Sequence, residues 1–271
     1  MTEKEYRSNP SISRSELWRM NESPEKFKWY KDHPPAPTDS LVFGQYIHAL
    51  LLEPDKVDSM FYVLPKLNLR TKADKERLDE IRIECENNEL TMIDADSAET
   101  ARQMVEKCRS DPDVMELLNG AHEQEFFWTD EMTGERCKCR VDCLTEVDGE
   151  VTIVDYKTTA NASTYKFVRD MYSYGYHFQS GMYGAGVQTC LGLDKLPRFV
   201  FIAQEKKPPY SINRIEATED VIQLGYDKFR EFIGIYAECK MTDIWPGYCG
   251  ITGLANEAYL LEWVRDDNDT E

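Results

Sequence analysis

Three consecutive segments in the middle of the chain alternate apolar and polar side chains, as half-buried β-strands do. They cover residues 122–129, 136–147 and 151–158, and Thr133-Gly134 and Asp148-Gly149 supply turn signals between them. This spacing predicts an antiparallel meander, in which successive side chains point to opposite faces. The meander constrains the chain to a fold built around a sheet, and it fixes which polar side chains can meet.

Helical periodicity surrounds the meander. Helices are expected over 41–52, 72–89 and 96–109 before it, and a helix within 174–190, strands over 198–204 and 212–217 and a helix over 219–239 after it. This order predicts an α/β fold with a mixed β-sheet flanked by helices, plus an N-terminal helical addition.

A chain of 271 residues with 41% apolar residues can build one large domain. We expect a single domain over 1–265, with a mainly helical part (1–120), an α/β core (121–240) and a C-terminal extension (241–265), followed by an acidic tail (266–271). Apolar runs fall far short of the roughly 20 residues that span a bilayer. Eight Cys without a signal peptide are typical of reduced thiols. These features predict a cytoplasmic protein that does not enter a membrane.

Two charged triplets lie on adjacent predicted strands. Alternation places Arg140 and Asp142 on one face of the second strand, and Asp155 and Lys157 on one face of the third. Mg²⁺ prefers oxygen ligands, so Asp142, Asp155 and the Tyr156 carbonyl form a candidate metal site, with Lys157 placed to polarise a water molecule. An isolated triplet of this kind is more often a surface ion pair.

The triplets are part of a longer ordered set of motifs. Gly44-Gln45-Tyr46-Ile47-His48 precedes them, and Gln179-Ser180-Gly181-Met182-Tyr183 follows. The set resembles the RecB-like branch of the PD-(D/E)xK nuclease superfamily, and within it the RecE (exodeoxyribonuclease VIII) nuclease-domain family, over residues 10–250. The resemblance implies a restriction-endonuclease-like (PD-(D/E)xK) core. One departure is that no Pro precedes Asp142.

The resemblance also implies roles for individual residues. His48, Asp142 and Asp155 correspond to metal ligands, and Lys157 acts with the two aspartates in catalysis. Gln179, grouped with the catalytic residues, and Tyr183 border the active site and the DNA backbone. The implied cofactor is Mg²⁺, for which Mn²⁺ can substitute.

An iron-sulfur cluster is not expected. Ser23-Pro24 stands where the iron-sulfur nucleases of this superfamily have Cys-Pro, and Cys137, Cys139 and Cys143 share strand parity, as small hydrophobic residues on one face do.

Several assignments stay open at the level of sequence. Ser13, Arg14 and Ser15 lie where related exonucleases approach a 5′ end, but a helix N-cap followed by an exposed Arg explains them slightly better. Arg140 is a further candidate for DNA contact. Glu125 is a possible extra acidic ligand, and Glu123, expected on the same face, is not distinguished from it.

The function implied by the resemblance is Mg²⁺-dependent 5′→3′ digestion of linear double-stranded DNA, which releases 5′-mononucleotides and leaves a 3′ single-stranded tail for recombination by annealing. The implied partners are DNA ends, an annealing protein of RecT type and further copies of the chain in a ring, with a tetramer favoured; the setting is a bacterial host or a prophage. The alternatives are a structure-specific or restriction-like endonuclease on the same core, and a non-catalytic DNA-binding recombination scaffold.

The charge balance bears on this interpretation. Lys and Arg number 32 against 50 Asp and Glu, which gives a net charge of −18 and argues against a polyanionic partner. Residues 157–214, however, contain eight Lys or Arg and three acids, so this segment carries +5. A basic segment in an acidic chain predicts that DNA touches only the interior of the assembly.

Overall fold

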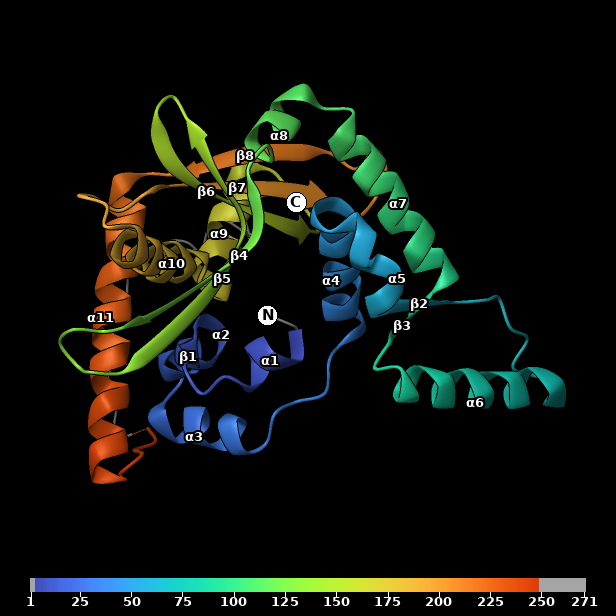
Figure 1. Ribbon diagram of the computed structural model, residues 1–271, viewed down its shortest axis with the longest axis horizontal. Coiled ribbons are helices and arrows are strands. Elements are labelled where there is room, and N and C mark those ends of the chain that lie inside the picture. Colours follow the sequence, from blue (N-terminus) through green and yellow to red (C-terminus); the bar gives the residue numbers. More distant parts are fainter. Residues whose placement is uncertain (1–2, 249–271) are drawn as a thin grey trace, which may run out of the picture.

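The computed structural model describes residues 3–248, and a six-stranded mixed sheet lies at its centre (Figure 1). The order is β1 (Ile12–Ser13), β5 (Arg136–Val147), β6 (Glu150–Thr159), β7 (Arg198–Glu205) and β8 (Ile212–Ala217), with β4 (Ala121–Thr129) also paired to β5. The predicted meander β4–β5–β6 is antiparallel, as is β7–β8, whereas β6–β7 and β1–β5 are parallel. The predicted α/β class with a mixed sheet is confirmed.

The sheet opens between β5 and β6. Their pairing runs from Val147–Glu150 to Cys143–Val154 and ends there. Beyond this point β6 continues along β7 to Thr159, while β1 takes the place beside β5. Where the two strands diverge, backbone groups of β6 next to Asp142 have no ladder partner on β5.

One face of the sheet is covered by α10 (Tyr176–Leu191), α11 (Glu219–Thr242) and the short α2 (Arg14–Leu17). The two long helices touch through glycines. A Cβ on Gly181 would lie 2.0 Å from the Tyr226 nitrogen, and a Cβ on Gly225 would lie 1.8 Å from the His177 carbonyl oxygen. Only glycine permits this approach, so the α10–α11 contact is fixed by the sequence.

The opposite face is covered by α4 (Asp39–Leu52), α7 (Ala95–Arg109) and α8 (Pro112–Leu117). Their apolar side chains pack on a second core that includes Cys143, Val154, Tyr156 and Ile202 of the sheet. Thr38 caps α4 by accepting a hydrogen bond from the Leu41 N–H, which starts the helix at the residues expected from its periodicity. This helix carries His48 to the opening between β5 and β6.

The remaining elements lie around these layers. They are α1 (Glu3–Ser8), the 3₁₀ turns η1 (Trp18–Asn21) and η2 (Pro54–Lys56), α3 (Pro24–Asp32), α5 (Val57–Met60), β2 (Phe61–Leu64), α6 (Lys72–Asn87), β3 (Thr91–Asp94) and α9 (Thr164–Tyr174). The polar helix α6 and the parallel pair β2–β3 project to one side (Figure 1). No helix among residues 3–248 is both long and apolar enough to cross a membrane. The predicted acidic tail and most of the C-terminal extension lie outside the described residues.

Candidate active site

The opening between β5 and β6 is bridged by Asp142 and His48. The Asp142 Oδ2 atom accepts a hydrogen bond of 2.8 Å from the Tyr156 N–H. On the other side, His48 Nε2 lies 3.0 Å from the Tyr156 carbonyl oxygen. The backbone of Tyr156 therefore ties a strand residue and a helix residue to the same point of β6.

The Tyr156 carbonyl determines the tautomer of His48. A carbonyl oxygen only accepts, so Nε2 carries the proton and Nδ1 of the neutral ring presents a lone pair. Nδ1 lies 3.5 Å from Asp142 Oδ2 and 4.0 Å from Glu123 Oε1. The predicted metal-binding carbonyl thus serves first to orient the imidazole, an arrangement typical of histidine ligands of metals.

Glu123, and not Glu125, accompanies His48 and Asp142. The backbone of Glu123 has a positive φ of 48°, which interrupts the alternation of β4 opposite Asp142. The core shows the same interruption in β5, because Val141 lies in one apolar cluster and Cys143 in the other. The Cα partner of Glu125 is Arg140, and the same arginine contacts Glu123.

His48, Glu123 and Asp142, the metal group, can hold a divalent cation. One ligand atom from each lies within 4.8 Å of the others. All three side chains are partly exposed, and Arg140 Nε contacts the second carboxylate oxygen of Glu123 at 2.9 Å. Two carboxylates and one imidazole suit Mg²⁺ or Mn²⁺, the imidazole being the more natural ligand of Mn²⁺. Asp155, the other predicted acidic ligand, is not part of this cluster.

Asp155, Lys157 and Gln179 form a second cluster, the lysine group. The Asp155 side chain is 1% exposed, its Oδ2 contacts the Lys157 ammonium, and its Oδ1 accepts a hydrogen bond of 2.5 Å from Gln179 Nε2. Burial raises the pKa of Asp155, the nearby Lys157 charge opposes that rise, and Asp142 adds to it. The predicted pairing of Asp155 with Lys157 on one face of β6 is present, and α10 supplies the amide that completes it.

The second residue of the predicted α10 pair is partly buried, whereas the first, Gln179, is buried. Tyr183 packs against the core beneath α10, and burial raises the pKa of its phenol well above the usual range. The ring of Tyr176, at the start of the same helix, lies 5.3 Å from the Lys157 ammonium. Tyr176, which is not part of the Gln179–Tyr183 motif, therefore borders the lysine group.

The segment Ser13–Ser15 does not have the exposed arginine that the helix-cap interpretation includes. Ser13 is the N-cap of α2 and forms a capping box with Glu16, whereas Ser15 is exposed. The Arg14 guanidinium donates hydrogen bonds to the carbonyl oxygens of Tyr174 and Gly175, the latter at 2.7 Å. Burial lowers the pKa of Arg14, and the charges of Tyr183 and Asp155 oppose this shift.

The three clustered cysteines belong to the core. Cys137 and Cys139 lie in the cluster under α10, and Cys143 lies in the cluster under α4, so they do not share a face as expected. Burial raises the pKa of Cys137 and Cys143 to about 12, which keeps these thiols protonated.

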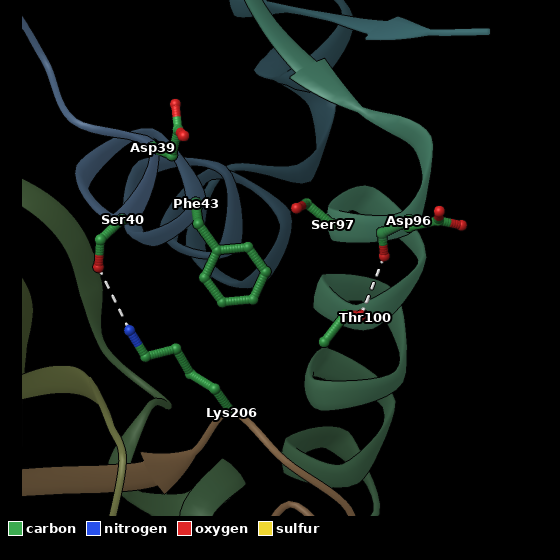
Figure 2. A pocket seen from close by; sticks show the side chains of 7 residues that line it. All are labelled: Asp39, Ser40, Phe43, Asp96, Ser97, Thr100 and Lys206. Atoms are coloured by element: carbon green, nitrogen blue, oxygen red, sulfur yellow. Dashed lines mark hydrogen bonds between the residues drawn. The ribbon is translucent and has the colours of Figure 1, made fainter. Parts of the chain in front are cut away.

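A hollow of about 370 Å³ lies apart from both groups, between the N-terminal ends of α4 and α7 (Figure 2). Lys206 Nζ donates to Ser40 Oγ at 3.2 Å on one side of this hollow, and Figure 2 shows Phe43 between Ser40 and Ser97. Two turns of α4 separate Ser40 from His48. The hollow contains none of the predicted site residues.

Comparisons with known proteins agree with this fold. A family model described as "PDDEXK-like domain of unknown function (DUF3799)" matches residues 13–257. A solved Eubacterium rectale protein described as "Putative exonuclease" superposes with a TM-score of 0.62 over 95% of this chain and 92% of its own, at 18% identity. The structure of SSO0001 matches 84% of this chain and 81% of its own at 11% identity, with a TM-score of 0.35 that carries no weight. No curated protein matches the sequence. The expected resemblance to the PD-(D/E)xK superfamily is thereby confirmed, and the chain belongs to the PDDEXK-like family DUF3799, whose domain has the fold of nucleases.

Proposed function

We propose that this chain is a metal-dependent exodeoxyribonuclease that degrades linear double-stranded DNA from 5′ to 3′, releases 5′-mononucleotides and leaves a 3′ single-stranded tail. The observation that supports hydrolysis is the meeting of the metal group and the lysine group on the two sides of Tyr156. Carboxylates, an imidazole and an ammonium around one opening in a sheet suit the attack of water on a phosphodiester. The polarity and the preference for ends follow from the resemblance to RecE-like nucleases.

Each group has a distinct task in this proposal. His48, Glu123 and Asp142 hold Mg²⁺ or Mn²⁺, and Asp155 belongs to the neighbouring lysine group. When bound, the metal supplies positive charge near the scissile phosphate and lowers the pKa of water. Lys157 orients the attacking water and offsets phosphate charge, while Gln179 holds the Asp155 carboxylate in place.

The assembly and the partners are part of the same proposal. A closed ring of copies, with four favoured, would direct the basic segment 157–214 toward the DNA and the acidic remainder outward. The 3′ tail would be handed to an annealing protein of RecT type in the cytoplasm of a bacterial host.

The test is digestion of a linear duplex labelled at its 5′ or 3′ end, with and without Mg²⁺. We expect release of 5′-labelled mononucleotides before any 3′ label is released, and no release in EDTA. A covalently closed circular duplex serves as the matched substrate and stays intact. Cleavage of the circle would replace the proposal with an endonuclease, and unchanged linear DNA would replace it with a non-catalytic scaffold.

A further inference from the structure

We propose that Tyr174 is a stacking platform for an unpaired base of the DNA strand next to the cleavage site. The inference rests on the proposed function and deepens it by naming how single-stranded DNA is held. Tyr174 ends α9, and its side chain is 58% exposed. Aromatic rings open to solvent are the groups on which single-stranded nucleic acids stack their bases without regard to sequence.

A short series of aromatic contacts connects Tyr174 with the lysine group. The Tyr174 ring lies 5.8 Å from the Tyr176 ring, and the Tyr176 ring lies 5.3 Å from the Lys157 ammonium. Phe167 and Phe201 support Tyr176 from the core side, at 5.6 and 5.9 Å. At the roughly 3.4 Å rise of a stacked strand, these two contacts cover the reach of a few nucleotides. Tyr174 is therefore within reach of a nucleotide whose neighbouring phosphate lies beside Lys157.

The backbone that carries Tyr174 is held in place. Arg14 donates hydrogen bonds to the carbonyl oxygens of Tyr174 and Gly175, which satisfies the C-terminal end of α9 with a cation. Gly175 has a φ of 68°, and a Cβ there would lie 2.5 Å from the Trp18 indole, so the joint between α9 and α10 is tightly packed. A rigid platform loses little conformational entropy when a base stacks on it.

The chemistry of this surface fits an unpaired nucleic-acid base. Bases in a duplex already stack on each other, so an exposed ring gains contact only where a strand is single. The helix α9 carries Lys166 and Arg169 against one acid, Asp170, and it lies within the +5 segment of a chain whose net charge is −18. Lys166 pairs with Asp170 at 3.0 Å, so the helix that ends at Tyr174 carries a net charge of +1, the sign that attracts a polyanionic strand.

The same helix offers a matched control. Tyr165 is 62% exposed but lies at the other end of α9, about 13 Å away at 1.5 Å per residue. It has the same side chain and similar exposure, yet it is far from the contacts that lead to Lys157. If a base stacks locally on Tyr174, replacing Tyr174 should weaken binding of single-stranded DNA more than replacing Tyr165. If any exposed aromatic ring has the same effect, the two replacements should weaken binding equally.

The experiment measures the binding of fluorescein-labelled (dT)20 by anisotropy in EDTA, where hydrolysis does not interfere. We expect Tyr174→Ala to weaken binding about tenfold, the loss typical of one base-stacking ring. Tyr174→Phe should stay within about twofold of the wild type because it keeps the ring, and Tyr165→Ala should match the wild type. Binding of a blunt duplex should change less than binding of (dT)20.

The inference is overturned if wild-type protein does not bind (dT)20, if Tyr174→Ala binds as the wild type does, or if the two alanine variants lose affinity equally. Thermal melting of each variant checks that the fold is kept. The readout in EDTA is independent of the proposed hydrolysis, so a wild type that binds (dT)20 through Tyr174 but leaves linear duplex intact with Mg²⁺ would contradict the nuclease proposal alone.

Discussion

The metal group and the lysine group lie on either side of one residue, Tyr156, yet they are built in opposite ways. The metal group is reached by solvent and is oriented mainly through backbone contacts of Tyr156. The lysine group surrounds a carboxylate that is 1% exposed and is compensated by one ammonium and one amide. Accessible carboxylates can exchange water for a cation at small cost, whereas a buried carboxylate depends on its permanent partners.

This difference teaches how the site divides its tasks. The two helical layers contribute one side chain each, His48 from α4 and Gln179 from α10, and the opened sheet lets them approach β6 from opposite faces. The accessible side is suited to binding a cation that comes and goes. The buried side is suited to holding one charged pair at a fixed place.

The largest effect is expected where the buried carboxylate loses its charge. Asp155→Asn should lower the hydrolysis of linear duplex by about 10²–10³-fold, because Lys157 loses the charge that positions it and the opening loses an anionic oxygen. Release of acid-soluble nucleotides with Mg²⁺ measures this loss, and a melting curve confirms folding. Activity within tenfold of the wild type would remove the lysine group from the catalytic site.

The two neighbouring glutamates test the accessible side. Glu123→Gln should raise the Mn²⁺ concentration needed for half-maximal activity by about 10–100-fold, a range typical of losses close to a metal. Glu125→Gln is the matched control, since it removes the same charge two residues away on β4. Equal shifts in the two metal titrations would show that Glu123 has no special place.

The position of α10 can be disturbed without touching a charged residue. Gly181→Ala should lower the free energy of unfolding by about 1–3 kcal/mol or more, because the added Cβ would meet the Tyr226 backbone. Gly234→Ala on α11 has open space around it and should be neutral or slightly stabilising. Chemical denaturation measures both variants, and equal stability would mean that α10 and α11 do not touch as described.

The smallest effect concerns the pH dependence of stability without metal. Burial raises the pKa of Asp155 in the folded protein, so the folded state binds this proton more tightly than the unfolded chain does. The stabilisation from this proton is complete below the ordinary Asp range and is lost as the pH rises through the raised value. In EDTA, the melting temperature of the wild type should therefore fall relative to that of Asp155→Asn as the pH rises from acidic to neutral. Parallel plots of melting temperature against pH for the two proteins would contradict the raised pKa of Asp155.

Much of the sheet could be predicted because its strands are apolar runs bounded by turn signals, even though β6 and β7 are buried over most of their length. The three segments of the meander and the strands near 198 and 212 agree with β4 to β8 within two residues. The alternation of side chains along a strand places Asp155 and Lys157 on one face of β6, where they meet. Local periodicity was enough wherever the backbone stayed regular.

Prediction from the sequence was wrong or incomplete where an irregular backbone or a contact distant in sequence determines the position of a residue or element. The positive φ at Glu123 turns its carboxylate toward His48, and no periodic pattern announces such an interruption. The short strand β1 and the pair β2–β3 are too brief to stand out, and no periodicity predicted α9. The left-handed backbone conformation of Glu123, opposite Asp142, is visible only in the structure.

The contact between His48 and Tyr156 joins positions 108 residues apart. Closing so long a loop costs conformational entropy that is recovered only after both partners are formed, whereas the hairpins of the meander close locally. During refolding, we therefore expect β-sheet circular dichroism to return before the ability to bind Mn²⁺. The rate at which metal binding recovers would then report the docking of α4. Formation of the site would be the last step in folding of the chain.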